Sequence, residues 1–310
     1  MSDRRLTATP SMLPLFARAG IAMLPGASRL PFVGGGGGEI PDQALVRSDV
    51  AVDRARLAAY DRVCGFDISD TLPPTYPHML AFPMHLALMT DGRFPLPAIG
   101  LVHVANTITV HRPIAASELL SLRVWATPIE PHPRGRQFTI RTEARVGEEL
   151  VWEEASTNLK RTHPPRDGNE PAAAADPPSA EGLPATAIWK LNGDLGRRYG
   201  SVSGDLNPIH VHPLTARLFG FPTAIAHGMW TKARCLAALG PQLSGRGGRG
   251  PYTVSVAFKR PILLPATVQF AEEAGPNGID FGVRDARRET PHLDGQVSFA
   301  GASRRPRRRA

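Results

Sequence analysis

The chain contains two similar halves, and this internal duplication limits the folds that it can adopt. Val110-His-Arg-Pro-Ile-Ala in the first half corresponds to Phe258-Lys-Arg-Pro-Ile-Leu in the second. Each motif follows a stretch of alternating apolar and polar residues, 101–110 or 252–258. Further corresponding residues are Phe82-Pro-Met with His227-Gly-Met, and Tyr60 and Gly65 with Tyr199 and Gly204. The offset of roughly 140–150 residues indicates one duplicated unit rather than a solenoid of short repeats.

Both halves are expected to contain the same order of elements. A helix ends at a glycine, an irregular stretch and a longer helix follow, and a run of strands completes the unit. The alternation predicts antiparallel strands with one buried face, against which the longer helix can lie. The predicted helices are 54–63, 79–89, 191–199, 213–218 and 228–239. The predicted strands are 101–110 and 119–126 in the first half, and 252–258, 266–274, 278–283 and 296–300 in the second.

Low-complexity stretches divide the chain into five regions. Residues 1–45 are expected to form an N-terminal arm that ends in a glycine run, 34–38. The first half occupies 46–163, a linker rich in proline and alanine occupies 164–185, and the second half occupies 186–300. Residues 301–310 form a basic tail with no aromatic residue among its arginines. This composition is typical of a solvated tail and does not favour nucleic-acid binding.

Composition limits the cellular compartments and the kinds of site that are expected for this protein. The only cysteines, Cys64 and Cys235, are far apart, which argues against a disulfide framework and a thiolate metal site and favours the cytoplasm. The sequence has no apolar run long enough to span a membrane. Residues 11–24 are apolar but are interrupted by Pro14 and Arg18, so we expect a surface helix or arm there rather than a signal peptide.

A carboxylate and an imidazole lie close together in Gly204-Asp-Leu-Asn-Pro-Ile-His. On a regular helix, Asp205 and His210 would point about 140° apart. The Asn207-Pro208 pair instead predicts a turn, on which the two side chains can converge. An acid and a base in this arrangement suit proton transfer beside a carbonyl group. The sequence leaves open which of the two acts as acid and which as base at each step.

Gly228 is expected to supply a third functional group, its backbone N–H. It precedes a good helical stretch, so its N–H should be one of the unpaired donors at a helix start, where the helix dipole adds positive potential. Because glycine has no side chain, a ligand can approach this backbone closely. A thioester oxygen placed there would be stabilised as negative charge develops on it, by about 3 kcal/mol in the transition state.

These motifs resemble those of a known enzyme family. Gly204-Asp-Leu-Asn-Pro-Ile-His, followed by Ala226-His-Gly-Met, is similar to the signature of the MaoC-like dehydratases, the (R)-specific enoyl-CoA hydratases. Residues 74–83, Arg112-Pro-Ile and Pro291-His-Leu are similar to the two-hotdog actinobacterial 3-hydroxyacyl-thioester dehydratases. The resemblance implies an α+β double hotdog: two antiparallel sheets, each wrapped round a central helix, forming a pseudo-dimer in one chain.

The resemblance also implies a reaction and its site. The expected activity is that of a hydro-lyase in fatty-acid metabolism, which reversibly adds water to the α,β double bond of an acyl thioester. Asp205 and His210 would be the catalytic pair, and the Gly228 N–H would bind the thioester oxygen. Asn207 would support the loop, and His227 would either hold the loop or contact the substrate. The expected partner is an acyl-CoA or acyl-carrier-protein thioester, with no cofactor, no metal and a possible homodimer.

Two other functions remain open at this point: a hotdog acyl-CoA thioesterase and a non-catalytic acyl-thioester-binding protein. The first half is expected to be an inactive hotdog that accommodates the acyl chain. Around Gly65 it reads Cys-Gly-Phe-Asp-Ile-Ser-Asp, so Asp67 and Asp70 lack the imidazole that follows Asp205. A metal site on Asp205, His210 and His212 has no further ligand spacing to support it.

The remaining histidines and Tyr199 are given no catalytic role. His78 and His85 are seven residues apart on one helical face, without a carboxylate beside them in the sequence. His103 and His111 share one side of a strand and are expected at a domain junction or at the surface. Tyr199 is expected to pack at a helix end.

Overall fold

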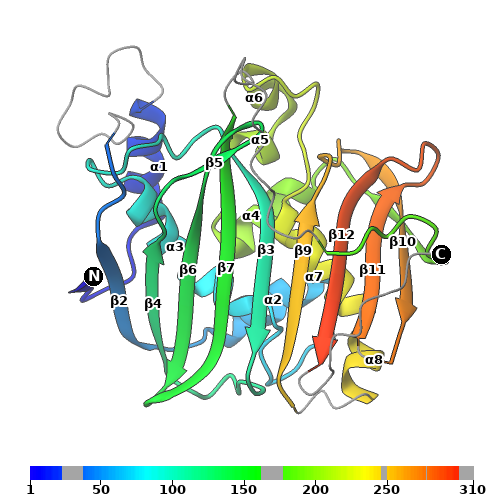
Figure 1. The fold of residues 1–310 in the computed structure, drawn as a ribbon, viewed down its shortest axis with the longest axis horizontal. Coiled ribbons are helices and arrows are strands. Elements are labelled where there is room, and N and C mark those ends of the chain that lie inside the picture. Colours follow the sequence, from blue (N-terminus) through cyan, green and yellow to red (C-terminus); the bar gives the residue numbers. More distant parts are fainter. Residues whose placement is uncertain (23–37, 162–176, 246–249, 277, 300–310) are drawn as a thin grey trace.

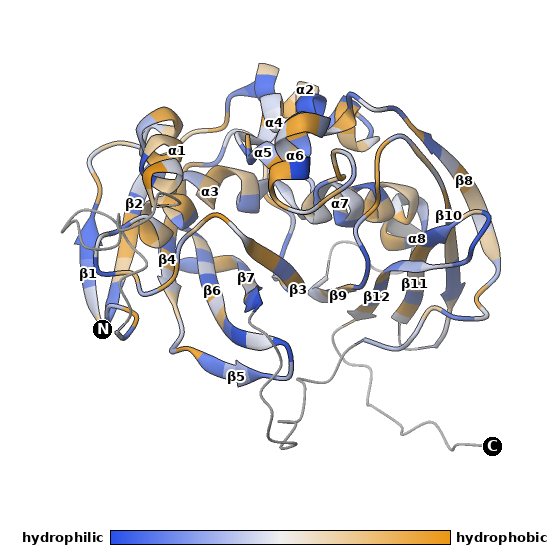
Figure 2. Ribbon diagram, turned by 90° about the horizontal axis from the view of Figure 1, so that it is seen from above, coloured by the Kyte–Doolittle hydropathy of each residue, from blue (hydrophilic) through white to orange (hydrophobic). Residues whose placement is uncertain are grey.

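The computed structural model describes residues 1–22, 38–161, 177–245, 250–276 and 278–299. Within them, the strands form one continuous sheet, and the helices gather on one of its faces (Figures 1 and 2). Residues 34–37 of the glycine run, residues 164–176 of the expected linker and the basic tail lie outside the described residues.

The first half builds its part of the sheet around α3 (Tyr76–Met89). Ten of the fourteen residues of this helix are buried, because the sheet covers one side and other helices cover the rest. A shorter helix, α2 (Arg54–Cys64), precedes it and ends at Gly65 with the left-handed φ of 83° that glycine adopts readily. The strands are β2 (Gln43–Val50), β3 (Leu101–Val110), β4 (Leu120–Ala126), β5 (Glu130–His132), β6 (Gly135–Val146) and β7 (Glu149–Arg161).

The second half repeats this plan around α7 (Gly228–Ala238). Helix α4 (Leu195–Ser203) corresponds to α2 and also ends at a left-handed glycine, Gly204. The short helices α5 (Pro208–Val211) and α6 (Pro213–Leu218) follow it, and α8 (Gly240–Gly245) follows α7. The strands are β8 (Ala185–Leu191), β9 (Tyr252–Phe258), β10 (Ala266–Ala274), β11 (Gly278–Asp285) and β12 (Pro291–Phe299).

The two halves join edge to edge through β3 and β9. These strands run antiparallel, with Ala105–Val110 opposite 252–257, so the halves share one sheet. The order across it is β2-β4-β6-β7-β3-β9-β12-β11-β10-β8, with β5 beside β6. Figure 2 shows that both ends of the sheet curve around the helices. The seam therefore places α3 and α7 on the same face of one sheet.

Helices of one half also hold helices of the other. The Arg56 guanidinium on α2 donates to the Val202 carbonyl near the end of α4, at 2.8 Å. The Trp230 indole on α7 donates to the Val63 carbonyl at the end of α2, at 2.9 Å. Both contacts satisfy carbonyls that a helix end leaves unpaired. The first contact fixes α4, which precedes the expected catalytic loop, against the first half, and the second fixes α7 against α2.

The double hotdog predicted from the resemblance is confirmed. Most predicted elements lie within a few residues of the observed ones, but the helix predicted at 191–199 was placed too early. Residues 185–191 instead form β8, which pairs with β10, and α4 starts only at Leu195. The strand predicted at 296–300 starts earlier, at Pro291, because proline is tolerated as the first residue of a strand.

The N-terminal arm adds one strand and one helix to the first half. β1 (Ser2–Arg5) pairs in parallel with β2. Helix α1 (Met12–Ile21) lies in the apolar stretch predicted as a surface helix, with Leu15 and Ala19 buried. The described helices include none that is long and apolar enough to cross a bilayer.

Candidate active site

The loop after α4 carries Asp205 and His210. Gly204 ends α4 with a φ of 84°, which turns the chain sharply into Asp205. Asn207 then caps α5, its side-chain oxygen accepting from the Ile209 N–H at 3.4 Å, and Pro208 occupies the first turn. The break between the two helices brings Asp205 and His210 to the same side of the loop.

Two glycines on α4 allow this loop to lie directly on the helix. A β-carbon on Gly196 would stand 1.9 Å from the His210 carbonyl oxygen. A β-carbon on Gly200 would stand 2.9 Å from the Asp205 carbonyl oxygen. The two glycines are four residues apart and therefore share one helix face. Sequence reasoning missed them. Gly196 lies inside the predicted helix 191–199 and Gly200 directly follows it, and a glycine in a helical stretch can indicate close backbone approach.

The carboxylate of Asp205 is held at one oxygen and open at the other. Oδ1 accepts from the Asn207 N–H at 3.1 Å. Oδ2 lies 3.7 Å from Nε2 of His227, and the side chain keeps about a quarter of its surface exposed, at 26%. An ionised carboxylate with a free oxygen facing a cavity can accept a proton.

His210 is oriented as a neutral base. Its Nδ1 donates to the Ile225 carbonyl at 2.8 Å, so the ring proton is on Nδ1 and Nε2 carries a lone pair. Burial lowers the pKa of His210, only partly offset by the charge of Asp205 and the bond to Ile225. The ring therefore stays unprotonated at neutral pH, with Nε2 able to accept a proton.

His227 stacks on His210 and fixes it from one side. The two ring centroids are 3.7 Å apart, and the planes differ by 23°. Nε2 of His227 donates to the Asp205 carbonyl at 3.0 Å, while its buried Nδ1 has no partner among the described residues. Burial, followed by the neighbouring His210, lowers its pKa to about 3. Tyr199, buried in the middle of α4 and not at the helix end predicted for it, also packs on His227, with ring centroids 4.8 Å apart.

Gly228 is the first residue of α7, directly after His227. Its N–H is therefore among the helix-start donors that have no partner within the helix. A β-carbon at this position would stand 2.9 Å from the Phe258 ring, so the glycine also makes room for that ring. Both residues border the same cavity as Asp205 and His210.

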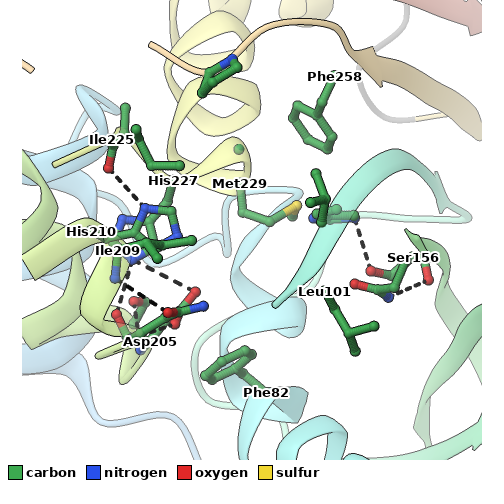
Figure 3. Close-up of a pocket in the computed structure, with 18 of the residues that line it drawn as sticks. Phe82, Leu101, Ser156, Asp205, Ile209, His210, Ile225, His227, Met229 and Phe258 are labelled. Atoms are coloured by element: carbon green, nitrogen blue, oxygen red, sulfur yellow. Dashed lines mark hydrogen bonds and ion pairs between the residues drawn. The ribbon is translucent and has the colours of Figure 1, made fainter. Parts of the chain in front are cut away.

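The cavity has a volume of about 250 Å³ and lies between the two halves. Figure 3 shows Asp205, His210 and His227 on one side and Ser156 and Leu101 on the other, with Met229 between them. The first half contributes apolar side chains, mainly from α3, and the arm contributes two residues of α1. The apolar lining includes Phe16, Met79, Phe82, Leu86, Met89, Ile99, Leu101 and Ile140.

The structure corrects one prediction about the first-half histidines, that His78 and His85 have no carboxylate neighbour. His78 and His85 do have a carboxylate neighbour: Glu154 of β7 accepts from Nδ1 of His78, 2.8 Å from one oxygen and 2.9 Å from the other. The sequence hid this contact because Glu154 lies far along the chain. His103 lines the cavity and bonds to Ser156, whereas His111 contacts Glu153 of the neighbouring strand.

Two clusters have the donor atoms of a possible cation site. Asp205, His210 and His227 each place a ligand atom within 4.8 Å of the others. Nε2 of His210 and Nδ1 of His227 are the ring nitrogens of this cluster that bond to no described residue. His78, His85 and Glu154 form the second cluster. His212, the alternative ligand in the sequence, instead caps α6 by accepting from Leu214 N–H at 3.2 Å.

Comparison with known proteins places this chain in one family. Residues 183–292 match the model of the MaoC like domain. The chain is 34% identical over 290 residues to 3-hydroxyacyl-thioester dehydratase X of Mycobacterium tuberculosis, covering 93% of this chain and 98% of that protein. It is 25% identical over 205 residues to the peroxisomal enoyl-CoA hydratase 2 of Arabidopsis thaliana, covering 61% and 64%.

The solved structures agree with the sequence relatives. A crystal structure of HtdX of Mycobacterium tuberculosis has a TM-score of 0.71 and 34% identity, covering 83% of this chain and 99% of that one. A MaoC-like dehydratase from Phytophthora capsici, at 19% identity, has the same fold with a TM-score of 0.68, covering 86% and 96%. The chain therefore belongs to the MaoC-like dehydratase family, in its two-hotdog form.

Proposed function

We propose that the protein is a hydro-lyase that dehydrates (R)-3-hydroxyacyl thioesters and, in reverse, hydrates trans-2-enoyl thioesters in fatty-acid metabolism. One observation carries the proposal: Asp205, His210 and Gly228 border a single cavity whose other walls are largely apolar. A carboxylate, a neutral imidazole and a helix-start N–H are the groups that this reaction needs. The apolar walls suit a fatty tail.

The thioester would bind with its carbonyl oxygen at the Gly228 N–H. As water adds to the β carbon, electron density moves onto this oxygen, and a donor at a helix start stabilises it. The acyl chain would extend along α3 into the first half. This position leaves the α and β carbons facing the loop that carries Asp205 and His210.

Asp205 and His210 would both accept hydrogen bonds from one water molecule. In hydration, they take a proton from the water, whose oxygen bonds to the β carbon while the π electrons shift toward the carbonyl. The same proton then passes to the α carbon as the enolate collapses. The net change is H–OH added across the double bond, and the protein returns to its starting protonation state. Dehydration follows the same steps in reverse.

His227 and Asn207 would act as positioning residues. His227 holds the Asp205 carbonyl and stacks on the His210 ring, and Asn207 accepts from the Ile209 N–H and donates its own N–H to Asp205. Neither needs to exchange a proton with the substrate. Their contribution is to keep the two acceptors within a few tenths of an ångström of the reactive geometry.

The carrier is proposed to be coenzyme A or an acyl carrier protein, and the protein to work in the cytoplasm. Cys64 and Cys235 are free thiols in the described structure, which suits a reducing compartment. A homodimer would add copies of the site without completing it, because both halves of the cavity come from one chain. Light scattering of the purified protein measures its oligomeric state.

Purified protein should remove the enoyl absorbance of crotonyl-CoA or of a longer trans-2-enoyl-CoA. A thiol reagent added to the same reaction should detect no free coenzyme A. Chiral analysis of the product should give the (R) alcohol. Loss of absorbance matched by released thiol would identify a thioesterase, and tight binding without any turnover would identify an acyl-binding protein; either result would overturn the proposal.

A further inference from the structure

A second polar cluster lines the cavity on the first-half side, away from Asp205. Glu154 is almost completely buried, with 2% of its surface exposed, and accepts from Nδ1 of His78. Burial favours the neutral acid, but the charge of His78 and its hydrogen bond outweigh burial and hold the pKa of Glu154 at about 2. An ionised carboxylate therefore lies behind the wall of a cavity that otherwise suits a fatty tail.

This carboxylate is part of a network that crosses the seam. The Asn106 amide donates to Glu154 at 2.6 Å, and the Asn106 side-chain oxygen accepts from the Lys232 ammonium at 2.6 Å. Lys232 is fully buried on α7 and also donates to the Val254 carbonyl at 3.1 Å. The network links β7, β3, α7 and β9, so the orientation of Glu154 is fixed from both halves.

The groups in front of the network keep unused hydrogen-bonding capacity. Among the described residues, His78 makes hydrogen bonds only through Nδ1, and it lines the cavity. Ser156 bonds to Nε2 of His103 at 2.9 Å, which leaves the other lone pairs of its hydroxyl without a partner. Figure 3 shows Ser156 directed toward the cavity, across from Asp205.

A plain hydrocarbon tail would not match this wall. It would displace water from His78 and Ser156 and offer nothing in return, at a cost of about 1–3 kcal/mol for each polar group left unpaired. A tail with a hydrogen-bonding group at this depth would satisfy them instead. The rest of the α3 face, with Met79, Phe82 and Met89, would still hold the methylenes on either side.

We propose that His78 and Ser156 bind a hydroxyl group on the acyl chain, so that the preferred thioesters carry an oxygen in the tail as well as at carbon 3. A hydroxyl fits because it both donates and accepts, whereas a ketone only accepts. This inference rests on the proposed function, because it takes the cavity to hold an acyl tail.

Binding of unreactive thioesters tests the inference separately from catalysis. Saturated acyl-CoAs of one length are compared by calorimetry: a plain chain, chains with one hydroxyl at successive carbons from carbon 5 onward, and the matching ketones. At one or two positions the hydroxylated chain should bind about tenfold more tightly than the plain chain, the effect of one buried hydrogen bond. The ketone at that position should bind less tightly than the alcohol.

Two variants should reduce this preference. Ser156→Ala and His78→Phe each remove one partner, so the ratio of plain-chain Kd to hydroxylated-chain Kd should fall by about threefold or more. His78→Phe also takes a partner from buried Glu154, so its folding is checked by thermal unfolding, and Ser156→Ala provides the test if it unfolds. Met89→Leu, an apolar change on the same cavity wall, is the control and should leave the ratio unchanged.

The possible results are distinct. No preference for a hydroxyl at any carbon, or a preference that both variants leave intact, would overturn this inference while the enzyme still hydrates plain enoyl-CoAs. No binding of any acyl-CoA and no hydration would overturn the proposed function too. A preference that falls in the two variants and persists in Met89→Leu supports the hydroxyl site.

Discussion

The two halves of the molecule share a plan and differ at the start of the central helix. In the second half, α7 begins at Gly228, which lines the cavity and whose N–H has no partner within the helix. In the first half, the residue that corresponds in sequence is Pro83, which has no N–H and lies inside α3. The first-half helix starts earlier, at Tyr76, and the additional turns carry His78. The same architecture supplies a backbone donor in one half and a binding wall in the other.

The loops before these helices differ in the same way. After Gly204, the chain makes two short helices that hold Asp205 and His210 against α4. After Gly65, the corresponding stretch runs past exposed Asp67 and reaches α3 without a short helix or a histidine between. Duplication thus preserved the sheet and the core helix, while the loop and the start of that helix separate a candidate catalytic half from a supporting one.

The largest expected difference between the halves comes from their aspartates. Asp205→Asn keeps the shape and the oxygen that accepts from Asn207, but it removes the proton acceptor, so kcat for enoyl-CoA hydration should fall by about 10³. Asp67→Asn, the control in the first half, should leave kcat unchanged. Steady-state kinetics on both variants measures this, and an Asp205→Asn enzyme with undiminished turnover would refute the assigned role.

Gly228→Pro should give the next largest effect, because it deletes the N–H without breaking the helix. Proline is accepted at the first helical position, and His227 before it has φ −68° and ψ 137°, an extended conformation that suits a following proline. Loss of one oxyanion donor should lower kcat by about 10²–10³.

The control at this position is Gly228→Ala. It keeps the N–H but pushes on the Phe258 ring, so it reports the steric part alone. Equal losses in the alanine and proline variants would show that space, and not the donor, is what Gly228 provides. Pro83→Gly in the first half should create no new activity.

The buried histidines should make stability depend on pH in both halves. Burial lowers the pKa of His85, His103 and His227 to about 3. The unfolded chain therefore binds more protons than the folded one below about pH 6.5, and stability is lost as the pH falls through this range. Each ring should cost on the order of 2 kcal/mol of unfolding free energy between about pH 6.5 and about pH 4.5.

Asp61 acts in the opposite direction, because burial raises its pKa to about 6. Because the two contributions oppose each other, the test compares each histidine variant with the parent protein. Urea unfolding of His85→Leu and of His227→Leu should show a shallower decline of stability with falling pH than the parent protein. If neither decline becomes shallower, these rings are charged in the folded state.

The smallest expected effect comes from two helix-capping side chains, Asn207 in the proposed catalytic loop and Asp53 outside it. Asn207→Ala and Asp53→Ala each remove a side chain that caps a helix, α5 in the second half and α2 in the first. Each should cost about 1 kcal/mol of stability, measured by chemical unfolding. Only Asn207→Ala should also lower kcat, by a few-fold, since it loosens the loop of Asp205. A similar kcat loss in Asp53→Ala would mean that general destabilisation accounts for both.

The sequence by itself determined the duplication, the central helices and six of the twelve described strands, because apolar periodicity and turn residues are local properties of the chain. The strands β1, β2 and β5 to β8 were not predicted. It also singled out Asp205, His210 and Gly228, since Asn207-Pro208 and a helix start act within a few residues. Only the tertiary structure decided what surrounds them. Glu154 meets His78, Lys232 meets Asn106, and the Gly196 face receives the loop through strand pairing and helix packing between residues far apart in the chain. Such contacts depend on register and on the seam between the halves, which no local pattern encodes.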